Sequence, residues 1–170
     1  TELGYLQELV AYWRERFDWR AQEALLNRFA QFTAPVPQLG RQHGEGQRLH
    51  FIHERSPHEG ALPLLLLHGW PGSVYEFHKL IPLLTRPEES GGEASDAFHV
   101  VAPSLPGYGW SPAPQTPGAT PRAFARLFAA LMEETLGYRR YGLQGGDWGS
   151  VIASWAALDR PGSAVGLHLN

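Results

Sequence analysis

A continuous apolar run, Leu62–Leu67, lies near the middle of the sequence. A strand that is apolar on both faces is typical of a parallel sheet covered by helices on both sides. Strand-like and helix-like hydrophobic periods alternate from residue 47 to the end of the chain. This alternation predicts the α/β class, with a mostly parallel sheet and flanking helices.

Hydrophobic period, together with the positions of Gly and Pro, gives the expected elements. Strands are expected at 47–54, 62–68, 98–103, 140–145 and 164–169. Helices are expected at 3–17, 19–29, 74–84, 120–136 and 148–158, and loops at 33–46, 88–96 and 104–118. The helix at 120–136 has the clearest start signal, because Thr120 suits an N-cap and Pro121 suits the first turn.

Composition narrows the function classes. The 170 residues are 43% hydrophobic and carry a net charge of −3, which argues against a disordered chain and against an electrostatic nucleic-acid binder. Because the sequence has no cysteine, disulfides, cysteine-ligated zinc and thiol nucleophiles are excluded. No glycine-rich phosphate-binding motif is present. His50 and His53 are expected at the surface, on opposite faces of a strand, so no metal site is expected.

The amino-terminal residues show no targeting signal. Charged side chains are spread through the first twenty residues, so no secretory signal is visible. The apolar run Leu62–Leu67 is too short to cross a bilayer. We therefore expect a cytoplasmic location.

The sharpest motif is Gly-Gly-Asp-Trp-Gly at 145–149, between an expected strand and an expected helix. Small residues on both sides of a central side chain are typical of a nucleophile elbow, where a strand turns sharply into a helix. The central residue is Asp147, a carboxylate where a serine is usual. The alternative is that Asp147 is simply a helix N-cap.

Two further loops are expected at the same edge of the sheet. His-Gly-Trp-Pro-Gly at 68–72 follows the buried strand, and its glycines leave the backbone room to turn while Pro71 stiffens it. The alternative for this loop is a plain strand-to-helix turn. The second loop, at 103–111, is rich in Pro and Gly and contains Trp110, which either lines a pocket or merely packs.

Together these motifs resemble the α/β-hydrolase-fold epoxide hydrolases, and the microsomal-type branch most closely. The resemblance rests on LLLLHGWPGS at 64–73, PSLPGYGWS at 103–111 and QGGDWGS at 144–150. Residues 5–32 resemble the amino-terminal segment of that branch, which packs against the hydrolase core. The resemblance implies an amino-terminal helical segment at 1–46 and the first half of an α/β-hydrolase core at 47–170.

The resemblance also implies a mechanism and a role in detoxification. Asp147 would attack an epoxide carbon and form an alkyl–enzyme ester, and water would then cleave this ester to release a vicinal diol. The backbone N–H groups of Trp70 and Trp148 would form the oxyanion hole. Trp148, Trp70, Pro71 and Trp110 are expected to bind a small apolar epoxide, and neither a cofactor nor a metal is required.

Several family features have no match in this sequence. In this fold the acid and the histidine follow the nucleophile, yet the one histidine after Asp147 is His168, in an apolar strand. The lid with its two tyrosines is also unmatched, and His68 is interpreted as structural. We therefore expect that the rest of the hydrolase chain or a second polypeptide supplies the acid, the base and the lid. Residues 1–170 alone are expected to be inactive in turnover and prone to aggregate.

Two other readings remain open. A haloalkane dehalogenase uses the same aspartate chemistry, with the tryptophan beside the nucleophile binding the leaving halide. Trp70 and the long amino-terminal segment favour the epoxide interpretation over this one. The second alternative is a catalytically incomplete hydrolase-fold subunit that acts as a binding module, which the absent histidine supports.

Overall fold

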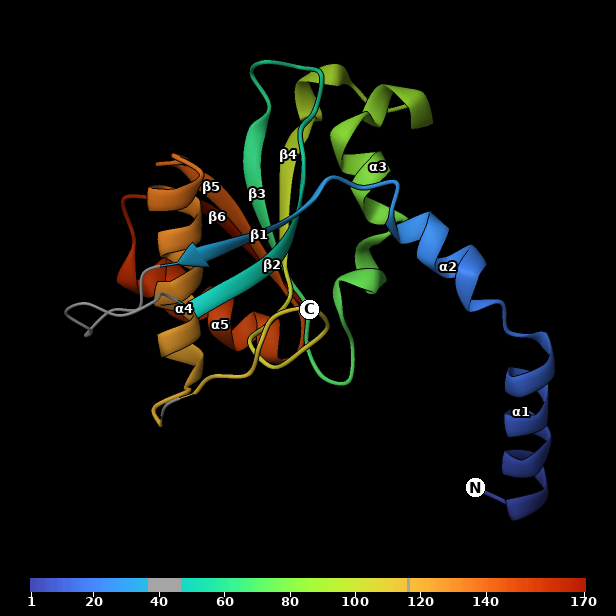
Figure 1. Cartoon of the computed structure of the whole chain (residues 1–170). Coiled ribbons are helices and arrows are strands. Elements are labelled where there is room, and N and C mark those ends of the chain that lie inside the picture. The colour runs from blue at the N-terminus through green and yellow to red at the C-terminus, as the bar shows by residue number, and fades with distance from the viewer. Residues whose placement is uncertain (37–46, 116) are drawn as a thin grey trace.

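The computed structural model describes residues 1–36, 47–115 and 117–170. A six-stranded sheet with the order β1-β2-β4-β3-β5-β6 runs through the molecule (Figure 1). β4, β3, β5 and β6 are mutually parallel, whereas β2 pairs antiparallel with β4 and β1 pairs antiparallel with β2. The strands are β1 Gln31–Val36, β2 Gln47–Glu54, β3 Leu62–Leu67, β4 Phe98–Pro103, β5 Tyr141–Gly145 and β6 Ala164–Leu169. The expected mostly parallel α/β sheet is confirmed.

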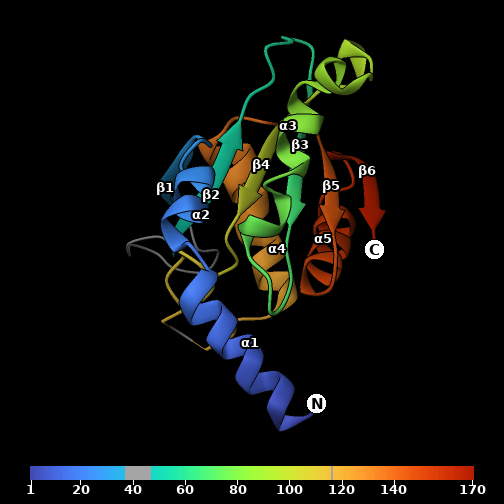
Figure 2. The ribbon, with the colours of Figure 1, turned by 90° about the vertical axis from the view of Figure 1, so that its right-hand side faces the viewer.

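Helices cover both faces of this sheet (Figures 1 and 2). The helices are α1 Leu3–Arg16, α2 Trp19–Leu26, α3 Leu80–Thr85, α4 Pro121–Ala130 and α5 Trp148–Asp159. Successive residues of β3 alternate between two cores: Leu65 and Leu67 pack with residues of α4 and α5, and Leu66 packs with residues of α3 and the preceding turn. This alternation is the reason why Leu62–Leu67 is apolar without interruption.

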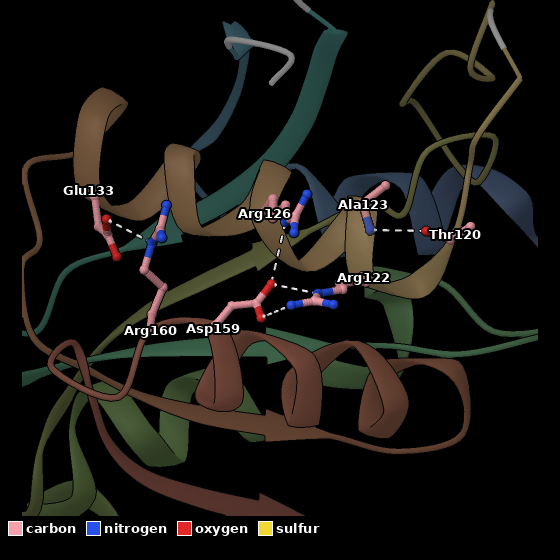
Figure 3. Close-up of polar contacts among 7 residues, drawn as sticks. All are labelled: Thr120, Arg122, Ala123, Arg126, Glu133, Asp159 and Arg160. Atoms are coloured by element: carbon pink, nitrogen blue, oxygen red, sulfur yellow. Dashed lines mark hydrogen bonds and ion pairs between the residues drawn. The ribbon is translucent and has the colours of Figure 1, made fainter. Parts of the chain in front are cut away.

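Charged side chains hold α4 and α5 together at the surface (Figure 3). Asp159 receives two hydrogen bonds from Arg122, from Nε at 3.0 Å and from Nη2 at 2.8 Å, and a third from Arg126 Nε at 3.3 Å. The expected cap of α4 is confirmed, because Thr120 Oγ1 accepts a hydrogen bond from the Ala123 N–H at 3.2 Å. These contacts fix the start of α4 and the end of α5 on one face of the sheet.

Three local expectations were wrong. The loop expected from residue 33 is strand up to Val36, because antiparallel pairing with β2 supplies partners that a local pattern does not reveal. The expected helix at 74–84 is a 3₁₀ turn, Val74–Phe77, followed by α3, since Pro82 has no N–H for the His78 carbonyl four residues earlier. The helix expected to reach residue 136 changes at Leu131–Thr135 to a π-type turn, closed by Leu136 N–H to Leu131 O at 3.0 Å. Residues 37–46 of the expected loop lie outside the described residues.

The expected polar loop at 88–96 also contains two short 3₁₀ turns, Pro87–Ser90 and Ala94–Asp96. The remaining expected strands and helices are present with shifts of up to three residues at their ends. The order of strands, turns and helices therefore brings the ends of β3, β4 and β5 to one edge of the sheet, as the sequence predicts.

The amino-terminal segment is only partly attached to the sheet. α2 buries Leu26, and its Gln22 Oε1 accepts a hydrogen bond of 2.6 Å from Tyr75 Oη on the turn Val74–Phe77. α1 projects away from the sheet and has no buried residue (Figures 1 and 2). Within residues 1–36, 47–115 and 117–170, no helix has the length and apolar character needed to span a membrane.

Candidate active site

Asp147 lies at the sharp junction between β5 and α5. Its backbone has φ 49° and ψ −127°, and it is the one non-glycine residue with positive φ in the part of the chain that the structure describes. A Cβ atom on Gly145 would overlap the Gly149 carbonyl, and one on Gly149 would overlap the Leu67 carbonyl. The elbow expected from the 145–149 spacing is therefore present, with the carboxyl of Asp147 exposed at the edge of the sheet.

The loop after β3 reaches the Asp147 carboxyl directly. The Trp70 N–H donates a hydrogen bond of 2.8 Å to Asp147 Oδ1. Gly69 lies against the same side chain so closely that a Cβ atom on it would overlap Asp147. Asp147 occupies the N-cap position of α5, but its side chain makes no capping hydrogen bond, so the simple capping alternative does not describe its contacts.

Backbone amides set the charge of Asp147. The Trp70 N–H, which donates to Oδ1, and after it the adjacent Trp148 N–H lower the pKa of the Asp147 carboxyl below its ordinary value. The carboxyl is therefore ionised at neutral pH, as a nucleophile must be. The two amides that act on it are the two expected oxyanion-hole donors.

His68 lies beneath this site and bridges two loops. Its ring is 1% exposed, with Nε2 accepting from the Leu105 N–H at 3.0 Å and Nδ1 3.1 Å from the Gly69 carbonyl oxygen. Burial lowers the pKa of His68, so the ring is neutral at pH 7. The contacts support its interpretation as structural, because both ring nitrogens are used within the loops.

The expected substrate-binding residues are not all brought together. Trp148 lines an apolar hollow of about 170 Å³ with Leu105, Tyr108, Phe124 and Ile152 among its walls. The side chains of Trp70, 66% exposed, and Trp148, 49% exposed, are open to solvent.

Pro71 follows Trp70 through a cis peptide bond and is also exposed. Trp110 lies instead against the His50 ring, 5.0 Å between centroids, in a different hollow that Trp19 also lines. The structure thus places Pro71 in the loop that holds Trp70, but does not bring Trp110 to Asp147.

Glu76 is a site residue that the sequence did not indicate. One oxygen of its carboxyl lies so close to Gly72 that a Cβ atom there would overlap it, so Glu76 packs against the same loop. Partial burial is the main reason why the pKa of Glu76 is raised, and the negative charge of Asp147 adds to this effect. Nothing in the spacing of Glu76 distinguishes it from an ordinary surface residue.

The surface location expected for His50 and His53 was wrong. The two residues are 4% and 8% exposed. The His50 ring bonds Ser104 Oγ and Gln31 Oε1, and His53 Nε2 bonds Tyr138 Oη at 2.9 Å. Across the described ranges, no three His, Cys, Asp or Glu side chains are grouped so that they could hold a metal.

A base for water activation is not assembled around Asp147 by the described residues. His168 lies on β6, where it is in register with Gln144, and it is exposed. No hydrogen bond joins a histidine to Asp147 within the part of the chain that the structure covers.

Two family models match the chain. One described as "alpha/beta hydrolase fold" matches residues 63–169, and one described as "Epoxide hydrolase N terminus" matches residues 1–77. A protein of Stigmatella aurantiaca is 51% identical over 168 residues, which are 99% of this chain and 36% of that protein. Epoxide hydrolase 1 of Sus scrofa is 44% identical over 98% of this chain and 36% of its own length.

Solved structures agree with these matches. The juvenile hormone epoxide hydrolase of Bombyx mori superposes with a TM-score of 0.81 at 37% identity, over 97% of this chain and 41% of that chain. The Aspergillus niger epoxide hydrolase also gives 0.81, at 35% identity, over 100% of this chain and 41% of that chain.

The chain spans about a third of the length of the curated relatives it matches. The resemblance to epoxide hydrolases and to their hydrolase fold is confirmed over almost all of its residues. The chain belongs to the α/β-hydrolase fold family, and its amino-terminal part is similar to that of the epoxide hydrolases.

Proposed function

We propose that the protein to which this chain belongs opens small apolar epoxides to vicinal diols through a covalent ester on Asp147. The observation that carries the proposal is the ionised Asp147 carboxyl on the elbow, with Oδ1 held by the Trp70 N–H at 2.8 Å. The relatives named as epoxide hydrolases support the same reaction class.

The hydrogen bond to Oδ1 assigns different tasks to the two carboxyl oxygens. Oδ2 attacks an epoxide carbon from the side opposite the breaking C–O bond, and the epoxide oxygen leaves as an alkoxide that takes a proton. Oδ1 then becomes the carbonyl oxygen of the ester. Water attacks Cγ, and the negative charge that develops on Oδ1 is stabilised by the Trp70 N–H that already donates to it, with the Trp148 N–H as the second proposed donor. The Cγ–Oδ2 bond then breaks, the diol leaves with the former Oδ2, and the oxygen from water stays in the Asp147 carboxyl.

A carboxylate suits this chemistry better than the usual serine. Attack by a serine on a saturated carbon would leave an ether, which water does not cleave, whereas attack by Asp147 leaves a hydrolysable ester. The apolar hollow beside Trp148 is fitted to the hydrocarbon part of the substrate. Trp148 and Trp70 are the tryptophans that we propose to contact it, and Pro71 shapes the loop that carries Trp70.

The remaining groups are proposed to come from outside these residues. A proton donor for the alkoxide, a histidine base and its acid partner are supplied by the rest of the polypeptide or by a second chain. The cytoplasmic location expected from the sequence stays a prediction, which cell fractionation would test.

Oxygen labelling tests the covalent mechanism. In a single turnover of the complete protein with a styrene-type epoxide in ¹⁸O-water, the label should enter the Asp147 carboxyl, where mass spectrometry of the peptide detects it. Label found only in the diol would mean direct attack by water and would refute the proposal. Asp147→Asn should lower diol formation by about 10⁴-fold or more, whereas Asp96→Asn, at an exposed surface carboxyl, should not change it.

Supplying the complete protein with a bromoalkane, beside the epoxide, distinguishes an epoxide hydrolase from the two alternatives. Halide release without diol formation from the epoxide would favour a haloalkane dehalogenase. Binding of the epoxide with neither product, by the complete protein, would favour the binding-module alternative. We expect diol formation and no halide release.

A further inference from the structure

The Trp70 N–H and the Gly69 carbonyl belong to one peptide unit, and each end of this unit has a partner. The N–H donates to Asp147 Oδ1 at 2.8 Å, and the carbonyl oxygen lies 3.1 Å from Nδ1 of His68. In a planar trans peptide the N–H and the C=O point in opposite directions. A rotation of the unit that moved one end would therefore break both contacts.

The backbone at this point has little stiffness of its own. Gly69 has no side chain to restrict its dihedral angles, and it cannot have one because a Cβ atom would overlap Asp147. Close approach to the nucleophile thus requires the residue that least fixes the peptide unit. The orientation of the Trp70 N–H has to come from a contact to a neighbouring group.

The His68 ring supplies that contact through its hydrogen bond to the Gly69 carbonyl. Nε2 accepts the Leu105 N–H at 3.0 Å, so Nε2 carries no proton and the proton of the neutral ring is on Nδ1, which donates to the Gly69 carbonyl. The ring is 1% exposed and meets Tyr108 edge-on, 5.5 Å between centroids. The orientation of the His68 ring is therefore set by the 103–111 loop, which follows the neighbouring strand β4.

We propose that His68 is a positioning residue, which aims the Trp70 N–H at Asp147 by holding the carbonyl at the other end of the same peptide unit. His68 touches neither the substrate nor the Asp147 carboxyl. It acts through the peptide bond, and it makes the oxyanion hole depend on the position of the 103–111 loop. The catalytic part of this inference rests on the proposed function, while the geometric part does not.

Two substitutions of His68 each remove one of the two hydrogen bonds of its ring and keep the other. In His68→Gln the longer side chain reaches the Leu105 N–H but leaves the Gly69 carbonyl without its donor. In His68→Asn the amide stands where Nδ1 stood and keeps a donor for Gly69, while the Leu105 N–H loses its acceptor. A purely structural role would make both variants lose stability without a specific effect on Asp147.

The readout is the titration of the Asp147 carboxyl, followed by ¹³C NMR in the complete protein. The Trp70 amide is the first cause of the lowered pKa of Asp147, so His68→Gln should raise this pKa and His68→Asn should return it toward the wild-type value. His53→Gln is the matched control, because His53 is 8% exposed and hydrogen-bonded to Tyr138 but contacts neither loop. An unchanged Asp147 pKa in folded His68→Gln would overturn the proposal.

Single-turnover kinetics test the catalytic part of the proposal. His68→Gln should slow hydrolysis of the ester by about 10–100-fold, less than the loss expected when an oxyanion donor is removed outright, and change its formation little. The ester should then accumulate. If the Asp147 pKa shifts as expected but no ester forms in any variant, the proposed function fails and the positioning role stands.

One measurement needs no variant. ¹⁵N NMR of the wild-type protein should show the His68 proton on Nδ1. A proton on Nε2 would remove the donor to the Gly69 carbonyl and overturn the proposal, even if both variants failed to fold.

Discussion

α5 and α1 begin with a similar sequence, but α5 packs against the sheet whereas α1 is exposed. Each has glycine as its second residue, Gly149 in α5 and Gly4 in α1. Gly149 packs against the carbonyl of Leu67 so closely that no Cβ fits, whereas nothing lies within 4 Å of the position of a Cβ on Gly4. The comparison teaches that hydrophobic period identifies a helix in both places, but that only close contacts with the sheet fix where the helix lies.

The same substitution in both helices is the strongest test of this difference. Gly149→Ala should lower the free energy of unfolding by about 3 kcal/mol, the upper end of the usual cost of overpacking, because the new methyl group meets backbone that cannot move aside. Gly4→Ala should be neutral or stabilising by up to about 1 kcal/mol, since alanine favours a helix and has free space here. Denaturant unfolding of the complete protein measures both. Equal costs would break the comparison.

Lowering the pH should reduce the free energy of unfolding through a residue of the sheet and not through α1. Burial is the main cause that lowers the pKa of His53 to about 4, with the positive charges of Arg55 and His99 adding to it. Between about pH 6.5 and 4 the unfolded chain binds a proton on this residue that the folded chain does not, so the free energy of unfolding falls as the pH falls. Above pH 6.5 both states are neutral and the effect vanishes.

The contribution of His53 should be on the order of 1–2 kcal/mol after solvent screening. We expect denaturant unfolding at pH 7 and pH 4.5 to show this loss in the wild type, and a smaller difference between the two pH values in His53→Gln. α1, which contains no histidine, should contribute nothing to it. An unchanged pH difference in His53→Gln would mean that other groups carry the acid sensitivity of the sheet.

Local rules sufficed for much of the fold and for the centre of the site. The unbroken apolar run Leu62–Leu67 predicted a central strand, and the spacing of small residues around Asp147 predicted the elbow. Both signals are local, since a buried strand must be apolar on each face and a sharp turn excludes Cβ atoms at the flanking positions. The Trp70 amide was expected near Asp147 from the family resemblance, and its N–H donates a hydrogen bond to Asp147 Oδ1.

The parts that could not be predicted depend on contacts between distant segments. Strand β1 owes its conformation to pairing with β2, and Trp110 is placed by the ring of His50 rather than by its own loop. Glu76 reaches the site because it lies on a 3₁₀ turn, from which its carboxyl packs against Gly72. None of these contacts leaves a periodic or spaced pattern in a single sequence.

The smallest expected effect concerns the apolar residues of α1. Leu3, Leu6, Val10 and Trp13 recur at helical spacing, as they would in a buried helix, yet they are 43–70% exposed. If period alone determined packing, Leu6→Gln would cost as much as truncation of a core leucine, about 2–5 kcal/mol. Because the structure shows no buried partner for α1 in the residues it describes, the change should stay within about 0.5 kcal/mol.

Leu65→Ala is the matched control for Leu6→Gln, since Leu65 is fully buried on β3 and should show the full core cost. Denaturant unfolding of both variants of the complete protein measures the loss in free energy of unfolding at α1 and at β3 under the same conditions. A cost above about 1 kcal/mol for Leu6→Gln would contradict the comparison, and it would place a packing partner for α1 beyond the residues described here. A negligible cost, the expected result, would show that helical spacing of apolar residues does not by itself bury a helix, since Leu6 is 43% exposed whereas Leu65 is fully buried.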